Sequence, residues 1–402
     1  MKVAVIGGGV SGCFAAIALK RGGADVEIIE RKDRVLKKLL ATGNGRCNLT
    51  NAKFSKNCYN HPDFVESAFN LNDNEDFIDY LKLLGILTVE EELGRIYPMS
   101  LKAQNVVNLL LEEMEELQIP IHLSSPVISI EKKKNFELKT NEEVFHSDAV
   151  IFACGGSSAP KFGTDGKSYK LLEAFGHRVT SLHPALTQIR LKSEYLKQFS
   201  GAKVQGEISL FCKGEKVACD FGEILFTDYG VSGPPVLNLS KYVNLQEGSK
   251  YVEMPLVNML KDEKLMREEI ISQIYMLDYF SLERFLMGIM DKKLINYVVY
   301  SLKADKTDSL SNLEDFQRRK LVEILLSSSF EVTGTRGFEN SHVTSGGLDI
   351  SQIDENTMES RMVKDLYVIG EVLDIDGECG GYNIQWAFSS AMLCAKDILY
   401  GE

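Results

Sequence analysis

The first 30 residues alternate between apolar runs and a glycine-rich loop. The apolar run over residues 2–7 predicts a buried strand, residues 13–21 predict a helix, and residues 26–29 predict a second strand that ends at Glu30. The loop before the helix reads GGGVSG over residues 7–12, and Glu30 stands 18 residues after its last glycine. This order of strand, GxGxxG loop, helix, strand and acid predicts a dinucleotide-binding βαβ unit.

The glycines of this loop have different predicted roles. Gly7 permits the tight turn, Gly9 lets the backbone approach a pyrophosphate, and Gly12 lets the helix pack closely on the strand. The helix N-terminus faces the phosphates, and Glu30 accepts from both hydroxyls of an unphosphorylated ribose, as in FAD or NAD. The alternative is a glycine turn that only joins two packed elements. The predicted contacts here are Gly7, Gly9, Val10, Ser11, Gly12 and Glu30.

A meander of strands follows the first unit. Residues 121–145 predict short strands with a hairpin at 132–135, and the apolar run 148–152 predicts a strand that leads to Gly155 and Gly156. A meander followed by such a strand is typical of large flavoproteins. This arrangement favours FAD over the cofactor of a simple dehydrogenase.

The second half of the chain predicts two inserts and a return to the first domain. Residues 188–254 predict a small β-barrel or sandwich, and residues 366–371 and 383–399 predict a buried strand and a helix that rejoin the N-terminal domain. Spaced apolar positions predict helices over 268–279, 282–290, 294–302 and 313–326. The predicted domains are 1–187 and 343–402 for FAD binding, 188–256 with 330–342 for the barrel-like insert, and 257–329 for the helical insert.

Composition excludes several classes of protein. With 402 residues, 44% hydrophobic and 25% charged, the chain has the composition of a soluble globular protein with two or three folding units. The formal net charge of −12 argues against a nucleic-acid partner. The N-terminal apolar run belongs to the βαβ unit and not to a secretory signal, and no stretch predicts a membrane span. Eight cysteines without a CxxC pair predict no metal site, no disulfide-reductase chemistry and a reduced, cytoplasmic setting.

A second segment with ligand-binding chemistry spans residues 37–51, KKLLATGNGRCNLTN. Gly43, Asn44 and Gly45 tolerate positive φ, so successive N–H groups can converge on an anion. Arg46 is placed to contact phosphate or the carbonyl groups of a flavin pyrimidine ring. The alternative is an ordinary polar turn. Cys47 is interpreted as a small packed side chain and not as a redox partner of the flavin.

Two glycine motifs near the C-terminus complete the predicted site. Gly370 and Glu371 follow a buried strand and are similar to the second flavin fingerprint, in which the acid accepts a hydrogen bond from the ribityl chain. A solvated loop acid is the alternative. The turn at Gly380 and Gly381 begins a helix whose N–H groups can face the N1–C2=O edge of a flavin. A structural helix start with Asn383 as its cap is compatible with that interpretation.

The chain resembles the BaiN/RdsA-type NAD(P)/FAD-dependent oxidoreductases, also described as aminoacetone-oxidase-family FAD-binding enzymes. The resemblance rests on GGGVSG at Gly7, ATGNGRCNLTN at Ala41, GRIYPMSLKAQNV at Gly94, GEILFTDYGVSGPP at Gly222, VTSGGLDI at Val343 and TMESRMVKDLYVIGEVLDIDGECGGYNIQWAFSSA at Thr357. It implies an α/β, Rossmann-like FAD domain of the two-dinucleotide-binding type, interrupted by a β-barrel-like insert and a helical insert. The activities that it implies are reduction of activated carbon–carbon bonds, as in steroid-like enones, or amine oxidation.

The resemblance also implies FAD contacts at the first glycine loop, Glu30, Arg46 to Asn48, Glu371 and Gly381 to Ile384. The predicted FAD contacts beyond the first glycine loop are Glu30, Arg31, Lys38, Asn44, Gly45, Arg46, Cys47, Asn48, Val127, Gly155, Gly370, Glu371, Gly381, Tyr382, Asn383 and Ile384.

Two departures from the family pattern concern the reaction. Where relatives often read Ala-Thr-Gly-Gly, this chain has Cys154 before Gly155, and where they often read Phe-Thr-His it has Asp228. An aspartate is a stronger acid than histidine and is ordinarily ionised at neutral pH, so the proton donor is left open. The candidate catalytic residues are Tyr97, Asp228 and Tyr229, with packing as the alternative for both tyrosines.

The leading hypothesis is an FAD-dependent oxidoreductase that passes hydride through flavin N5 to reduce an activated, enone-like small molecule. Because no second GxGxxG follows the first, either NADH or NADPH visits the flavin transiently as electron donor, or another compound donates the electrons. The alternatives are a flavin-dependent amine oxidase, an NAD-only dehydrogenase and a non-catalytic, FAD-stabilised scaffold that binds a partner through its inserts. We expect a small-molecule substrate and neither a nucleic-acid nor a membrane partner, and the oligomeric state is left open.

Overall fold

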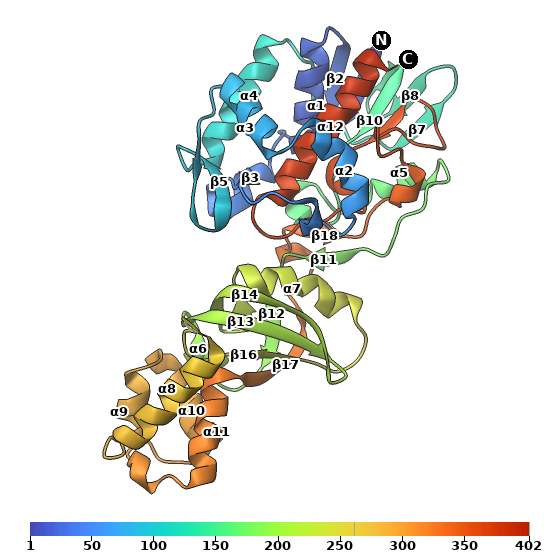
Figure 1. Cartoon of the computed structure of the whole chain (residues 1–402). Helices are drawn as coiled ribbons and strands as arrows, with labels where there is room; N and C mark the ends of the chain where they lie inside the picture. The colour runs from blue at the N-terminus through green and yellow to red at the C-terminus, as the bar shows by residue number, and fades with distance from the viewer. Residues whose placement is uncertain (261, 402) are drawn as a thin grey trace. The chain divides into compact units, whose positions relative to one another are not determined.

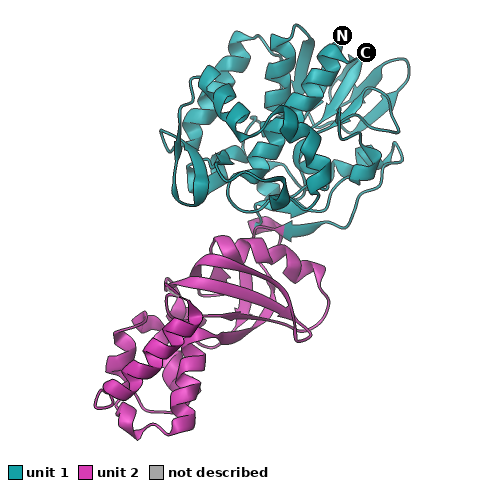
Figure 2. Ribbon diagram, viewed as in Figure 1, with its two compact units in different colours: residues 1–184, 341–402 teal, residues 185–340 magenta. Residues whose placement is uncertain are grey.

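The computed structural model describes residues 1–260 and 262–401 of the chain. Residue 261, which falls in the predicted helical insert, and residue 402 lie outside the described residues. The chain forms two compact units (Figure 1, Figure 2): unit 1 comprises residues 1–184 and 341–402, and unit 2 comprises residues 185–340. Unit 2 is therefore an insertion in the sequence of unit 1.

A parallel sheet forms the centre of unit 1. Its five strands follow the order β19-β10-β1-β2-β6, and every pairing between them is parallel. Strand β1 lies in the middle because Val3, Ala4 and Val5 are fully buried and apolar on both faces, as a strand covered on two sides requires. The strands are β1 (Lys2–Ile6), β2 (Asp25–Ile29), β6 (Ile121–His122), β10 (Ala149–Phe152) and β19 (Leu366–Val368).

Two helices from opposite ends of the chain pack against each other in unit 1. They are α1 (Val10–Arg21), drawn in blue, and α12 (Tyr382–Tyr400), drawn in red (Figure 1). Three buried rings join them to a third helix: Phe388 stacks on Phe77 at 4.3 Å and meets Phe14 edge-on at 5.3 Å. The other helices are α2 (Pro62–Leu71), α3 (Asn74–Leu83), α4 (Ala103–Glu116) and α5 (Tyr169–Glu173).

Unit 1 also contains the antiparallel sheets β3-β5-β4 and β7-β8-β9, and its strand β18 pairs with β11. The predicted hairpin is present in the meander β7-β8-β9, but residues 121–122 do not belong to that meander. They pair with β2 instead. The prediction was wrong because a strand of two residues is too short for its sequence pattern to identify its partner. The remaining strands are β3 (Thr50–Asn51), β4 (Thr88–Glu90), β5 (Arg95–Pro98), β7 (Ser129–Lys132), β8 (Phe136–Lys139), β9 (Val144–Ser147) and β18 (Val343–Ser345). Strand β11 (His183–Ala185) spans the boundary between the units.

Unit 2 contains a closed barrel and a group of helices. The barrel order is β12-β15-β14-β13-β16-β17, so β17, which follows the helices in sequence, closes the barrel against β12. The strands are β12 (Ile189–Lys192), β13 (Lys203–Cys212), β14 (Glu215–Thr227), β15 (Gly230–Ser232), β16 (Lys250–Met254) and β17 (Ser328–Thr335). The helices are α6 (Leu196–Phe199), α7 (Pro234–Leu245), α8 (Glu263–Met276), α9 (Leu282–Met287), α10 (Lys292–Leu302) and α11 (Asp315–Leu326).

The predicted fold class, a Rossmann-like α/β domain with barrel and helical inserts, is confirmed, whereas the predicted domain boundaries stay predictions. Several helix starts differ from those predicted: α10, α11 and α12 begin within two residues of the predicted positions, and α1 and α8 differ by more. Helix α1 begins at Val10 and not at residue 13, because Gly9 already has the extended backbone of an N-cap. Helix α8 begins at Glu263, five residues before position 268, because the Asp262 side chain accepts from the backbone N–H of Lys264.

None of the described helices is both long enough and apolar enough to cross a membrane.

The aromatic cluster at α12 gives a test of what holds unit 1 together. Phe388 is 1% exposed, and we expect Phe388→Ala to lower the free energy of unfolding by about 3–5 kcal/mol, since it removes a ring and leaves a cavity. Tyr400 on the same helix is 74% exposed, and Tyr400→Ala should change the value by less than about 0.5 kcal/mol. Urea unfolding of both variants measures the difference, and equal losses would contradict the assignment of this cluster to the core.

Candidate dinucleotide site

The first glycine loop connects β1 to α1, and its backbone leaves no space for side chains. Gly7 has φ +105°, and a Cβ there would lie 2.5 Å from the carbonyl oxygen of Ala153 in the strand β10 segment. A Cβ on Gly12 would lie 2.0 Å from Gly7 O, whereas one on Gly9 would meet no atom closer than 3.9 Å. Gly7 and Gly12 are therefore required by packing, and Gly9 leaves a face of the backbone open to a ligand.

The start of α1 is suited to an anion. Its N-cap, Gly9, makes no side-chain capping bond, and the first turn contains no acidic residue. The first N–H groups of a helix lack intrahelical partners and carry a partial positive charge. Val10 and Ser11 therefore present free donors next to the open face of Gly9, as a pyrophosphate site requires.

Glu30 lies at the end of β2, beside this loop. It is 9% exposed, and its two oxygens accept from the backbone N–H groups of Gly8 and Lys32, each at 2.7 Å. Burial raises the pKa of Glu30 against the opposing effect of these two bonds. The bonds fix the orientation of the carboxylate, and each oxygen keeps a lone pair for a ribose hydroxyl.

Arg31, a predicted cofactor contact, has a partner within the protein. Its guanidinium binds the Asp165 carboxylate with both nitrogens, at 2.6 and 3.1 Å. Burial raises the pKa of Asp165, but the hydrogen bond from Arg31 and the other contacts of the carboxylate outweigh this effect and lower the pKa to about 2. Arg31 therefore attaches the loop at residues 163–165 to the end of β2. The Ser125 N–H donates to Glu30 O at 2.9 Å, which places the segment that leads to Val127 beside the end of β2. Val127 itself is half-buried.

The segment after residue 38 adopts the predicted left-handed backbone. Gly43 and Asn44 both have φ +54°, Gly45 has φ +81° and Cys47 has φ +64°. Cys47 is fully buried, and burial raises the pKa of its thiol to about 12, which agrees with its interpretation as a packed side chain. Arg46 forms an ion pair with Glu91.

Two buried polar atoms in unit 1 fit a ligand that is rich in hydrogen-bonding groups. Asn48 Oδ1 and the Tyr169 hydroxyl are enclosed and have no hydrogen-bond partner among the described residues. Burial raises the pKa of Tyr169, with a further contribution from the charge of Glu371. A buried polar atom without a partner lowers stability, so a ligand that supplies the missing bonds is favoured at these positions.

The second glycine motif lies directly against the first. Gly370 has φ +69°, and a Cβ there would lie 2.7 Å from Ser11 Oγ at the start of α1. Glu371 binds Lys38 Nζ at 2.6 Å through one oxygen and accepts from the Thr344 N–H at 2.9 Å through the other. A Cβ on Gly155 would lie 4.0 Å from the same carboxylate. The structure thus brings together Lys38, Gly155, Gly370 and Glu371, and it adds Thr344, whose contribution through a backbone amide leaves no signal in the sequence.

The third glycine motif starts α12. Gly381 has φ +104°, and a Cβ there would lie 2.4 Å from Thr50 O in β3, which ends the segment that contains Arg46. The helix begins at Tyr382 without a side-chain cap, so the alternative in which Asn383 caps it is wrong. The Asn383 side chain instead bonds both backbone groups of Gly377, at 2.8 and 2.9 Å. Ile384, one residue further along, is half-buried against the core.

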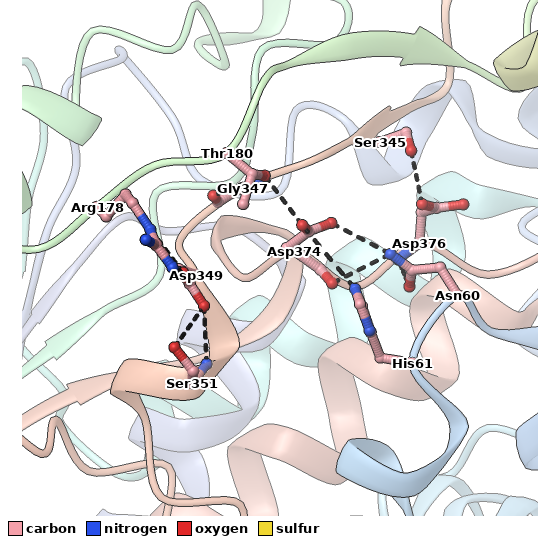
Figure 3. Close-up of polar contacts among 10 residues, drawn as sticks. All are labelled: Asn60, His61, Arg178, Thr180, Ser345, Gly347, Asp349, Ser351, Asp374 and Asp376. Carbon is pink, nitrogen blue, oxygen red and sulfur yellow. Dashed lines mark hydrogen bonds and ion pairs between the residues drawn. The ribbon is translucent and has the colours of Figure 1, made fainter. Parts of the chain in front are cut away.

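A polar network holds the loop that leads to this helix (Figure 3). Asn60 Nδ2 donates to Asp374 O at 3.2 Å, and Asn60 Oδ1 accepts from the Asp376 N–H at 2.9 Å. Thr180 Oγ1 donates to Asp374 Oδ2 at 2.9 Å, and Ser345 Oγ donates to Asp376 Oδ2 at 2.9 Å. Sequence reasoning missed Asn60, since its partners lie more than 300 positions away.

The three candidate catalytic residues do not share one unit. Tyr97 lies in β5 of unit 1, with its ring 4.5 Å from the guanidinium carbon of Arg46 and 3.2 Å from the position of a Cβ on Gly43. Burial raises the pKa of Tyr97. Asp228 and Tyr229 form the turn between β14 and β15 in unit 2, where Asp228 is exposed. Only Tyr97 therefore belongs to the same compact unit as the glycine motifs.

Known proteins are similar to this chain over almost its whole length. A family model described as the HI0933-like protein Rossmann domain matches residues 1–397. The chain belongs to the HI0933-like family. This HI0933-like protein is 32% identical over 403 residues to the 3-dehydro-bile acid delta(4,6)-reductase of Clostridium scindens, with 98% of each chain covered. It is 31% identical over 404 residues to the ribosomal RNA dihydrouridine synthase of Haemophilus influenzae, with 98% of this chain and 97% of the relative covered.

A solved structure has the same fold. It is the 3-ketosteroid delta1-dehydrogenase from Sterolibacterium denitrificans in complex with 1,4-androstadiene-3,17-dione, with a TM-score of 0.53, 12% identity and coverage of 100% of this chain and 99% of that chain. The family predicted from the sequence is confirmed, and with it the prediction of an enzyme of the oxidoreductase class. The predicted absence of a nucleic-acid partner stays a prediction, because one relative is named for ribosomal RNA.

Gly12 and Gly9 offer a matched pair of variants for the first loop. Gly12→Val places side-chain atoms inside the backbone of Gly7, so we expect the HI0933-like protein to lose bound FAD and several kcal/mol of stability. Gly9→Ala meets no atom closer than 3.9 Å, so it should fold normally and bind FAD more weakly. Flavin absorbance after gel filtration and thermal unfolding measure the two effects. Full flavin retention by Gly12→Val would show that the site lies elsewhere.

His61 gives a pH-dependent test of the network in Figure 3. Its Nε2 lies 3.9 Å from Asp374 Oδ2, and this contact raises the pKa of His61 with further contributions from the charges of Asp376 and Asp349. A raised pKa means that the stabilisation is complete below the ordinary histidine range and is lost as pH rises through the raised value.

We therefore expect His61→Gln to lower stability by less than about 1 kcal/mol near pH 5.5–6, because the side chain is partly exposed, and to have no effect by about pH 8. Urea unfolding across this range measures the difference. His146→Gln in β9, an exposed histidine without an ion pair among the described residues, is the control and should show no such trend. A His61→Gln effect that grows with pH would contradict the assigned contact.

Proposed function

We propose that this protein is an FAD-dependent oxidoreductase that reduces a carbon–carbon double bond conjugated to a carbonyl group, with NADH or NADPH as a transient electron donor. The observation that carries the proposal is the contact between the two glycine motifs, where a Cβ on Gly370 would lie 2.7 Å from Ser11 Oγ. A site for NAD alone needs only the first motif. Two motifs in one site suit a longer dinucleotide, with the adenosine half at Glu30 and the flavin half at Glu371.

The residues present fit this cofactor. FAD, when bound, supplies hydride transfer through N5 of its isoalloxazine ring. The start of α1 would hold the pyrophosphate, Glu30 would accept from the adenosine ribose, and Glu371 would accept from the ribityl chain. The N-terminus of α12 has no side-chain cap and no acidic residue in its first turn, so its N–H groups would stabilise negative charge on the pyrimidine edge.

Reduction of a conjugated alkene needs one proton besides the hydride. The hydride adds to the carbon far from the carbonyl, and the proton goes to the carbon next to it. Tyr97 is suited to hold that proton, because burial raises its pKa and keeps the phenol neutral at pH 7. Arg46 lies over its ring and fixes its orientation. Asp228 and Tyr229 stay proposals for the same role.

The names of the two relatives describe the same kind of bond. A 3-dehydro bile acid with delta(4,6) unsaturation has double bonds conjugated to its 3-oxo group, and dihydrouridine is uridine whose C5=C6 bond, next to C4=O, has been reduced. A small enone is the first candidate substrate, because a net charge of −12 disfavours approach to RNA phosphates. A uridine of ribosomal RNA is the second candidate, favoured by 31% identity over 98% of the chain to the rRNA enzyme.

Flavin absorbance tests the proposal in steps. The purified protein should be yellow, and NADH or NADPH should bleach it under anaerobic conditions. A 3-oxo-Δ4 steroid should then restore the colour and gain two hydrogens by mass spectrometry, with the corresponding saturated ketone as control. A uridine-containing rRNA transcript is tested in parallel for the second candidate.

Each step has an outcome that contradicts one part of the proposal. A well-folded, colourless protein that does not bind added FAD would exclude the flavoenzyme. If neither NADH nor NADPH bleaches the flavin, a nicotinamide electron donor is excluded. A reduced flavin that neither the enone nor the transcript reoxidises would exclude reduction of a conjugated alkene.

A further inference from the structure

A buried asparagine in β3 holds the turn that precedes α12. Asn51 is 3% exposed, and its Nδ2 donates to Gly380 O at 3.0 Å. Its Oδ1 accepts from the backbone N–H of Lys53 at 2.8 Å, so the two ends of the amide are distinguished by their partners. A longer contact joins Nδ2 to Leu93 O at 3.4 Å. The orientation of the Asn51 amide is therefore fixed, with its donors facing Gly380.

The hydrogen bond to Gly380 O sets the direction of the next N–H group. The peptide bond between Gly380 and Gly381 is trans, as is every peptide bond in the described residues. In a trans peptide the C=O and the N–H point in opposite directions. Because the carbonyl oxygen of Gly380 faces Asn51, the N–H of Gly381 points away from Asn51. This N–H makes no hydrogen bond within residues 1–260 and 262–401.

The N–H of Gly381 adds to a group of donors without partners. Gly381 is the N-cap of α12, and the N–H groups of Tyr382, Asn383 and Ile384 also make no hydrogen bond within the described part of the chain. The N–H of Gln385 is the first to bond, to Gly381 O at 3.1 Å. Successive donors and the positive end of the helix dipole thus lie at one place.

An enclosed acceptor in the adjoining segment also points to a ligand. Asn48 Oδ1, two residues before β3, has no hydrogen-bond partner among the described residues. A ligand that donates to it is favoured, because a buried acceptor without a partner lowers stability. This segment meets the turn at Thr50, whose O lies 2.4 Å from the position of a Cβ on Gly381. An acceptor and several donors together suit the pyrimidine edge of a flavin, which carries an N3–H donor and the N1 and C2=O acceptors.

We propose that Asn51 is a positioning residue that orients the Gly380–Gly381 peptide, so that the Gly381 N–H donates towards the pyrimidine edge of the flavin. The inference rests on the proposed function and deepens it, because it names a residue that raises the reduction potential of the cofactor. Negative charge collects at this edge when a flavin is reduced, so a donor aimed at it stabilises the reduced form more than the oxidised form. Asn51 acts only through the peptide.

The midpoint potential of the bound flavin tests this role without turnover. We expect Asn51→Leu, which has a similar volume but no donor, to weaken binding of reduced FAD about tenfold more than binding of oxidised FAD. For a two-electron couple this ratio lowers the midpoint potential by about 30 mV. Anaerobic equilibration of the holoprotein with a reference dye measures the potential. Asn51→Gln, which keeps the amide group, should recover part of the shift.

Gln385→Leu is the matched control. Gln385 is also a buried amide, at the start of α12, and its side chain bonds Asp73 O at 2.9 Å and Thr50 Oγ1 at 2.6 Å. Its loss should lower the thermal unfolding temperature, as Asn51→Leu does, but leave the potential unchanged. If Asn51→Leu does not fold, Asn51→Ser, whose side chain is too short to reach Gly380 O, should still lower the potential.

The outcomes separate this inference from the proposed function. An unchanged potential in a folded Asn51 variant without the amide would overturn the role of Asn51, as would an equal shift in Gln385→Leu, even if the protein reduces an enone. An Asn51-dependent potential in a flavoprotein that reduces no conjugated alkene would support this inference and refute the proposed reaction. A wild-type protein that binds no FAD would refute both, and its lack of colour would assign the failure to the proposed function.

Discussion

The close approach of chain segments at four glycines is the constraint on which the candidate site depends, and at three of these glycines the nearest atom belongs to the backbone. A Cβ would lie 2.5 Å from Ala153 O at Gly7, 2.0 Å from Gly7 O at Gly12, 2.7 Å from Ser11 Oγ at Gly370 and 2.4 Å from Thr50 O at Gly381. These contacts join segments from both ends of the chain around the start of α1. Because no side chain separates them, the backbone itself sets the positions of the donors and acceptors that face a dinucleotide.

The charged groups of the site are ordered by the same contacts. Glu30 is oriented by two backbone N–H groups, and Glu371 by Lys38 and the backbone N–H of Thr344. Lys38 and Glu371 stand 333 positions apart, so their ion pair forms only after the two ends of the chain have met. Correct closure of the fold therefore precedes formation of the flavin half of the predicted site, whereas the adenosine half is assembled within one local βαβ unit.

This difference explains how much could be predicted from the sequence. The first βαβ unit and the packing roles of Gly7 and Gly12 follow from local pattern, and the structure contains them nearly as predicted, whereas the ligand contacts of Gly9 and Glu30 stay predictions. Contacts that depend on distant partners left no local signal: Asn60 bonds the loop at Asp374, and Thr344 acts through its backbone amide. The prediction for residues 121–122 was wrong for a related reason, since the two residues of β6 are too few to specify a partner strand.

The alternative in which Asn383 caps α12 was wrong, although an asparagine near a helix start usually accepts from the helix backbone. Here Gly381, at φ +104°, is the N-cap, two residues before Asn383, and the Asn383 side chain bonds Gly377 instead. The α12 N–H groups consequently stay available, which strengthens the argument that this helix end faces an electron-rich ligand.

Substrate choice is a separate physical problem from cofactor binding. Backbone groups and glycines can hold a dinucleotide in many related sequences, but distinguishing a steroid acid from a nucleotide requires side chains of particular charge and shape. Relatives that share the glycine contacts of unit 1 can therefore differ in the side chains that select their substrates.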